Sequence, residues 1–149
     1  MTRWVWVAAL AAAPSAWAAG TIPASPVKQD TSDHRYAHDL DSGDKDDRLF
    51  AARVLLRRVK EATRVGNRNS SDIRVVEARQ RLEDFDRLIA PKCIRLLTTK
   101  NIARPCARML GLLETEAAIE PLQALLATDP AFCTKRTAGW ALQRIESSP

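Results

Sequence analysis

The chain has 149 residues, of which 46% are hydrophobic and 28% are charged, and its formal net charge is +5. This length gives room for one domain, and the composition excludes a fibrous or wholly disordered chain. The five glycines and the 5% of aromatic residues argue against a turn-rich β-sandwich, whereas abundant Ala, Leu, Arg and Glu in the second half favour an all-α domain.

The first 18 residues are typical of an export signal. A basic start at residues 1–3 precedes a ten-residue apolar run, and Ala16-Trp17-Ala18 has the pattern of a cleavage site. The run is interrupted at Pro14 and is shorter than the ~20 residues that cross a bilayer. We therefore predict a signal peptide over residues 1–18 and a periplasmic or secreted protein, with an uncleaved anchor as the alternative.

Export changes what the net charge means. Removal of residues 1–18 takes away one Arg and no acid, which leaves 22 basic and 18 acidic residues and a charge of +4. We expect no nucleic-acid partner for an exported protein. A mildly basic protein is suited to weak, salt-screened contact with an anionic membrane or polysaccharide.

Residues 19–46 are predicted to form a disordered leader. Prolines and small polar residues come first, and a run of acids with few apolar anchors follows. The helical domain is then predicted to span residues 47–147.

Two motifs in this leader resemble metal sites, and we expect neither to bind metal. The acidic stretch at residues 39–44 is similar to a calcium-binding loop, but Phe50 stands where such a loop needs a bidentate Glu. His34 and His38 would share a helix face, but Arg35 occupies the position of the Glu in a zinc HExxH motif. We predict no metal and no cofactor.

The domain is predicted to begin with an amphipathic helix over residues 47–65. Apolar residues recur there with the helical period, and the basic residues lie mostly off this stripe, at Arg53, Arg57, Lys60 and Arg64. Gly66 is expected to end the helix.

A second helix is predicted from a cap at residues 70–72 to Ala90. We expect it to stop there because Pro91 disfavours the α conformation in the residue before it, and Pro91 would open a short helix of its own.

The remaining sequence indicates a repeat. An apolar helical stripe in residues 103–113 is followed by the break Glu114-Thr115-Glu116, a second apolar helix to residue 127, and a last helix to residue 147. The stripe recurs 32 residues later, so that Cys106 matches Ala138 and Arg104 matches Arg136. A unit of this length cannot bury its apolar face alone and must stack on a neighbour.

The chain resembles the HEAT-like repeat family, in particular the short bacterial type also seen in phycobilin lyases. The resemblance lies in A-R-M-L-G-L-L, in E-A-A-I-E-P-L-Q-A-L-L with D-P, and in A-G-W-A-L-Q-R-I, and it covers residues 101–147 and, faintly, 72–98. Pro105 departs from the pattern, as does Gln143 at the place of Gly111. The resemblance implies a short α-solenoid of antiparallel helical hairpins that binds other proteins, and it carries no catalytic residues over.

The sequence shows no catalytic constellation. It contains no G-x-S-x-G, no glycine-rich phosphate loop and no paired-cysteine metal motif. We therefore predict a protein that is not an enzyme but an exported interaction or assembly module, whose partner is another protein or a second copy of the chain. The alternatives are an envelope-surface protein that binds anionic lipid or polysaccharide through residues 47–65, and a non-catalytic accessory subunit of an enzyme encoded elsewhere.

Trp140 is the candidate centre of the protein interface. On the last helix it lies opposite the apolar stripe, so we expect it to face outward, beside Arg136 and Arg144 and at the position that Arg108 holds one repeat earlier. Arg104 completes the candidate set. Tryptophan and arginine are enriched in interface hot spots. The alternative is that Trp140 packs over the preceding hairpin.

Cys93 and Cys106 are a candidate disulfide. They lie on consecutive antiparallel helices, each about six residues from the turn between them, so their heights match. Thiols tend to pair in an oxidising compartment. The alternative is that Cys106 fills a small core position, as Ala138 does.

Overall fold

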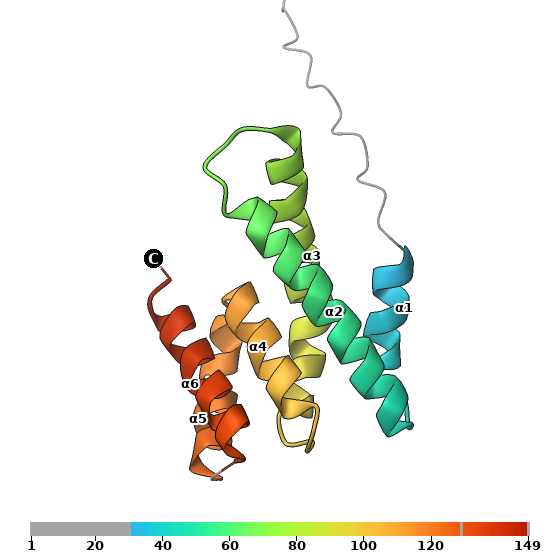
Figure 1. Ribbon diagram of the computed structural model, residues 1–149, viewed down its shortest axis with the longest axis vertical. Coiled ribbons are helices and arrows are strands. Elements are labelled where there is room, and N and C mark those ends of the chain that lie inside the picture. The colour runs from blue at the N-terminus through green and yellow to red at the C-terminus, as the bar shows by residue number, and fades with distance from the viewer. Residues whose placement is uncertain (1–30, 129, 149) are drawn as a thin grey trace, which may run out of the picture.

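In the computed structural model, the described residues are 31–128 and 130–148, and every regular element among them is helical. The all-α prediction is therefore confirmed. The elements, coloured along the chain in Figure 1, are α1 (Thr31–Asp39), α2 (Lys45–Gly66), α3 (Ile73–Leu96), α4 (Ala103–Leu113), the 3-10 turn η1 (Glu116–Ala118), α5 (Ile119–Ala127) and α6 (Phe132–Glu146).

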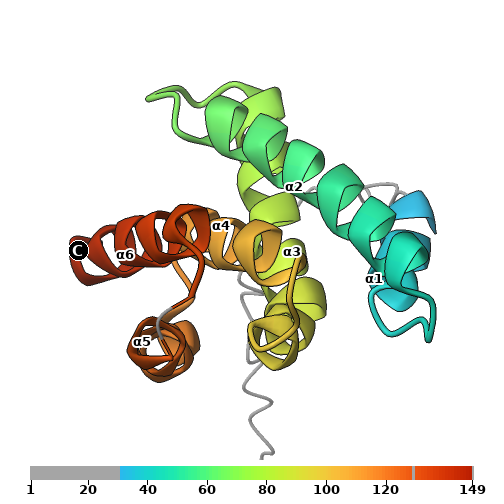
Figure 2. The same ribbon diagram turned by 60° about the horizontal axis from the view of Figure 1, so that its bottom comes forward.

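The short helix α4 lies at the centre of the arrangement. α2 and α3 form a long antiparallel hairpin that extends beyond the other helices (Figure 1), and α4 packs against both of them. α6 packs on another side of α4, α5 packs against α6, and α1 lies along α2 (Figure 2). One apolar cluster runs through all of them and includes Leu55, Phe85, Leu110, Leu122 and Ile145.

Acidic side chains fix the start of the two long helices. The Asp44 carboxylate accepts hydrogen bonds from the backbone N–H groups of Asp46, at 2.6 Å, and Asp47, at 3.2 Å, and so caps α2. Asp72 caps α3 by accepting from the N–H of Arg74 at 3.0 Å. Each cap satisfies donors that have no partner within the helix.

The predicted leader is ordered from residue 31 onward, which corrects the expectation of disorder through residue 46. Residues 31–39 form α1, and its Ala37 and the following Leu40 are fully buried. The buried Asp33 carboxylate binds Arg58 of α2 and Arg81 of α3. A local reading of an acidic, weakly apolar segment cannot detect partners 25 and 48 residues away. The predicted signal peptide and residues 19–30 lie outside the described residues.

α3 does not stop at Ala90, which corrects the predicted boundary. The helix continues through Pro91 to Leu96 as one 24-residue element. Pro91 lies on the exposed side, so water can reach the carbonyl one turn earlier that loses its N–H donor. The burial of Cys93 and Leu97 beyond the proline favours continuation.

The contact between α4 and α6 is unusually close at Gly111. A Cβ atom on this glycine would lie 2.8 Å from the Cα and Cβ atoms of Ala141 and from Cζ3 of Trp140. Gln143, which stands at the matching position 32 residues later, is exposed. No described helix packs on that side of α6, so the departure from glycine has a structural reason.

Candidate functional site

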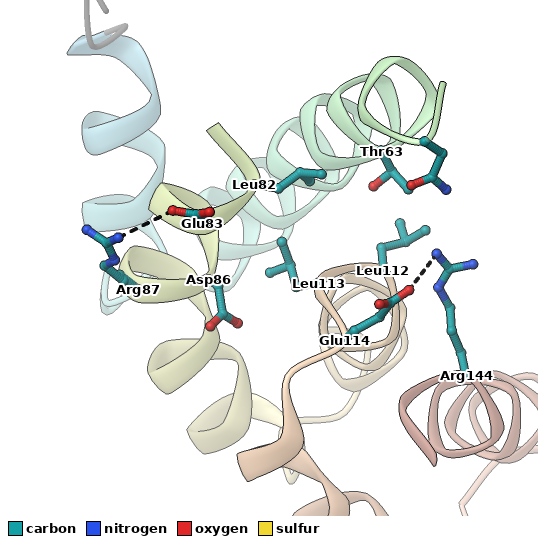
Figure 3. A pocket seen from close by; sticks show the side chains of 10 residues that line it. Thr63, Leu82, Glu83, Asp86, Arg87, Leu112, Leu113, Glu114 and Arg144 are labelled. Carbon is teal, nitrogen blue, oxygen red and sulfur yellow. Dashed lines mark ion pairs between the residues drawn. The ribbon is translucent and has the colours of Figure 1, made fainter. Parts of the chain in front are cut away.

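A cleft of about 360 Å³ opens where α2, α3, α4 and α6 converge. Figure 3 shows the side chains that line it. The lining residues are Thr63 and Asn67 from α2 and its C-cap, Leu82, Glu83, Asp86 and Arg87 from α3, Leu112, Leu113 and Glu114 from the end of α4, and Arg144 from α6.

The middle of the cleft is apolar. Leu82, Leu112 and Leu113 are half-buried and lie between two charged walls in Figure 3. α3 and α4 place them there because both helices turn their core stripe toward each other and leave these leucines at its margin. Partly exposed leucines on packed helices present apolar area that a ligand can cover without a rearrangement of the fold.

One wall is an ion pair between the end of α4 and α6. Glu114 ends α4 with φ 56°, in the left-handed conformation, and its carboxylate accepts from Arg144 Nη2 at 2.9 Å and from the Ser148 hydroxyl at 2.7 Å. The Nε atom of Arg144 is buried and has no hydrogen-bond partner in the part of the chain that the structure describes. The pair therefore carries an unused donor beside the cleft.

The opposite wall belongs to α3. Arg87 and Glu83 form a pair one turn apart at 3.6 Å, with both side chains largely exposed. The Thr115 hydroxyl donates a hydrogen bond to Asp86, which ties the break after α4 to α3, and it makes no cap hydrogen bond to the following turn η1. Each carboxylate that lines the cleft has a polar partner.

The chemistry of the cleft favours binding. None of its lining residues is His, Cys or Ser, and its acids are engaged by Arg or Thr. The apolar floor suits an aliphatic or aromatic side chain, and the exposed charges at its rim suit the polar groups around such a side chain.

The structure brings three of the predicted interface residues together, because Arg108 and Arg144 both lie against Trp140. Trp140 is half-buried and does not point straight outward, because its ring lies against Gly111 of α4. The guanidinium carbons of Arg108 and Arg144 lie 4.6 and 5.9 Å from the ring centroid. This corrects the expected orientation and agrees with the alternative that Trp140 packs over the preceding hairpin.

The arginines of that set have different surroundings. Arg104 and Arg136 are exposed, and Arg108 is exposed but stacks on Trp140. Of the predicted residues, Arg144 alone lines the cleft. An interface role for the set remains a prediction.

Cys93 and Cys106 meet in the core. Both are fully buried and free, on helices that pack directly against each other. Hydrogen bonding with the neighbouring Cys106, and after it burial, raises the pKa of Cys93 well above its usual range. Cys133 is exposed on α6. The structure thus brings the predicted pair together as thiols, and the disulfide itself remains a prediction.

The two metal-like motifs have other environments. His34 and His38 are exposed on α1. In the acidic stretch Asp41 pairs with Lys92 and Arg95, and Asp44 caps α2. Within residues 31–128 and 130–148, no three His, Cys, Asp or Glu side chains gather as metal ligands. No described helix has both the length and the apolar character for crossing a bilayer.

The outer face of α2 is basic. Arg53, Arg57, Lys60 and Arg64 are all exposed and follow one line along the helix, at spacings of four, three and four residues. Phe50, one turn before Arg53 on the same line, is 60% exposed. The sequence identified these residues, but their shared line follows only once the buried face of α2 is known.

The cleft itself was missed at the sequence level. The one local signal was the doublet Leu112-Leu113 before Glu114, which gives the end of α4 more apolar residues than one helix face can bury. The other lining residues come together only through packing of separate helices. Comparison with protein-family models, with curated proteins and with solved structures found no match.

Proposed function

We propose that the protein is an exported helical-repeat module that binds another protein, and that the cleft between α3 and α4 receives an apolar side chain of that partner. The observation that carries this proposal is the row of half-buried leucines between charged walls, on helices that are capped and packed. A preformed cleft of this kind lowers the ordering cost of association.

The packing of the last helices supports a short solenoid. α4 and α6, which share the 32-residue sequence match, lie side by side, and α5 packs against α6 (Figure 2). In stacked helical repeats each unit buries its apolar face on its neighbour, and the array offers its surface to other proteins.

Site-specific photocrosslinking tests the cleft. A photoreactive residue at Arg87, on the cleft wall, is expected to crosslink a distinct protein in the native envelope, and the same residue at Arg136, outside the cleft, is the matched control. A Leu112→Glu substitution should abolish the crosslink from position 87, because a charge would enter the apolar floor. Equal crosslinks from both positions, or a crosslink unaffected by Leu112→Glu, would contradict the proposal.

The same experiment separates the kinds of partner. A crosslinked product in purified protein at twice the chain mass indicates self-association. A product seen only in the envelope indicates a different protein, and enzymatic activity in that complex would support the accessory-subunit role.

A second candidate function is supported by the outer face of α2. Four exposed cations extend over about 16 Å of helix, and none of them has an ion-pair or hydrogen-bond partner among the described residues. An anionic lipid surface fits this face, with Phe50 entering the headgroup region.

Vesicle co-sedimentation tests this second function. Binding to vesicles with anionic lipid should fall steeply between low and high salt and should be lost when Arg57 and Lys60 are both changed to Gln. The control is the double change of Arg104 and Arg136 to Gln, which removes the same charge elsewhere. If both variants lose binding equally, net charge rather than α2 is responsible.

A further inference from the structure

We infer that Cys93 and Cys106 are the site of an internal disulfide that is installed while the chain folds and is afterwards sealed between α3 and α4. This inference is independent of the cleft and of the basic face, because it rests on the packing of two helices.

The two cysteines are placed symmetrically about the connection between the helices. Cys93 lies three residues before the end of α3 at Leu96, and Cys106 lies three residues after the start of α4 at Ala103. The helices pack directly against each other. Equal distances from the turn put the two side chains at the same height on helices that pack together, and both are fully buried.

The connection closes over the pair. Leu97 and Ile102, at the two ends of the turn, are both 2% exposed, and Asn101 reverses the chain with φ 75°. Cys93 and Cys106 are each 0% exposed. An oxidant in solution therefore has no route to either sulfur while α3 and α4 remain packed.

The protonation state of Cys93 also protects the folded pair from oxidation. The raised pKa of Cys93 keeps it as a thiol at neutral pH, and the thiolate is the form that attacks a disulfide. Before the helices pack, both cysteines have the ordinary reactivity of exposed thiols. The pair is reactive in the unfolded chain and inert in the folded one.

The oxidant that we assign is another disulfide, either of a small molecule such as glutathione or of an exchange protein. One cysteine thiolate attacks it, forms a mixed disulfide and releases one thiolate of the oxidant. The second cysteine thiolate then attacks the sulfur of the first cysteine, forms the Cys93–Cys106 bond and releases the second thiolate. Two cysteine thiols lose two protons and two electrons, and the oxidant becomes two thiols.

The test compares refolding with native oxidation, in the full chain carrying Cys133→Ser to prevent links between chains. Denatured protein is refolded in a buffer of reduced and oxidised glutathione, then unfolded and alkylated. We expect no alkylated cysteine, a non-reduced peptide that joins residues 93 and 106, and a Tm about 10 °C above that of the reduced protein.

The second arm adds oxidised glutathione to reduced, folded wild-type protein. Cys133 serves as the exposed internal standard. Cys93 and Cys106 should react with oxidised glutathione at no more than about one hundredth of its rate. Addition of urea should remove this protection.

Three outcomes would overturn the inference. They are two alkylated cysteines after refolding, a disulfide within the wild-type chain that joins Cys133 to Cys93 or Cys106, and oxidation of the folded pair as fast as Cys133. The matched control is Cys106→Ala in the Cys133→Ser chain, which copies the alanine found at position 138; its Tm should be the same in oxidising and reducing buffer.

Discussion

The two halves of the molecule are held together by different means. α2 and α3 are 22 and 24 residues long, and α1 is fastened to them by the buried Asp33 carboxylate between Arg58 and Arg81. α4, α5 and α6 have 9 to 15 residues. α4 packs so closely on α6 at Gly111 that no side chain fits between this residue and the backbone of Ala141. The first half thus has a buried charge cluster between its helices, and the second has a close helix contact that depends on a glycine.

This difference has a physical origin. Long helices bury much apolar area along their length, here through large side chains such as Phe85 and Leu55. Short helices have few contacts, so each gains most when small residues let the axes approach closely. We therefore expect the two halves to respond to different substitutions.

The largest effect is expected for Gly111→Ala. The new methyl group would meet backbone and Cβ atoms of Ala141, which cannot rotate away, and should lower the free energy of unfolding by about 1–3 kcal/mol despite the better helix propensity of alanine. Urea denaturation measures the change. The control is Gly139→Ala, at a helical site with nothing within 4 Å, which should raise stability by about 0.5–1 kcal/mol. If both substitutions stabilise, close approach does not hold the second half together.

Asp33→Asn should have the next largest effect. It removes the charge shared by Arg58 and Arg81, and because Asp33 is 10% exposed while the arginines are 26% and 41% exposed, we expect a loss of about 1–2 kcal/mol. Hydrogen exchange should accelerate in α1 and leave α4 and α6 unchanged. The matched control on the same helix is Asp39→Asn. The Asp39 carboxylate lies 4.0 Å from His38 Nδ1, and its loss should change stability by less than about 0.5 kcal/mol.

Arg108→Ala tests the nearer of the two cations that lie over the Trp140 ring. Loss of the contact with Trp140 should cost about 0.5–1 kcal/mol and should shift the indole proton resonance of Trp140. Arg104→Ala removes an equally exposed arginine from the same helix and should leave both the stability and the resonance unchanged. An equal effect of the two would mean that helix charge, not stacking, is responsible.

The smallest effect concerns Asp41 and acid. The hydrogen bond from Lys92 lowers the pKa of Asp41 in the folded protein, so its contribution is present above the unfolded pKa and is lost as the pH falls through the folded value, below about pH 4. Because Asp41 is 44% exposed, this contribution should be less than about 1 kcal/mol. Wild type and Asp41→Asn should therefore differ in urea midpoint at pH 7 and converge in acid; a constant difference would contradict the linkage.

Periodic residues made much of the fold predictable. The helical stripes located α2, α4, α5 and α6, and the cap predicted at residues 70–72 contains Asp72, which caps α3. α1 was not predictable because its buried acid depends on distant arginines. The predicted boundary at Ala90 was wrong. The residue before a proline generally disfavours the helical conformation, but here the burial of residues after Pro91 keeps the helix intact.

The site was less predictable than the fold. A helical wheel gives the direction of Trp140 relative to its own helix, but not the position of α4, which covers one edge of the ring. The cleft draws residues from four helices, and no local pattern joins them. The proximity of the two cysteines was easier to predict, because their helices follow each other in the sequence and the number of residues from each cysteine to the turn can be counted.

Gln143 has a consequence for growth of the array. A further helix that approached α6 as α6 approaches α4 would meet the amide side chain of Gln143 where α4 has the glycine Gly111. This face of α6 is therefore sterically closed to an additional unit docked in the same way. The substitution Gln143→Gly would remove this side chain, so position 143 is the place to begin when a further helix is added to this face of α6 by design.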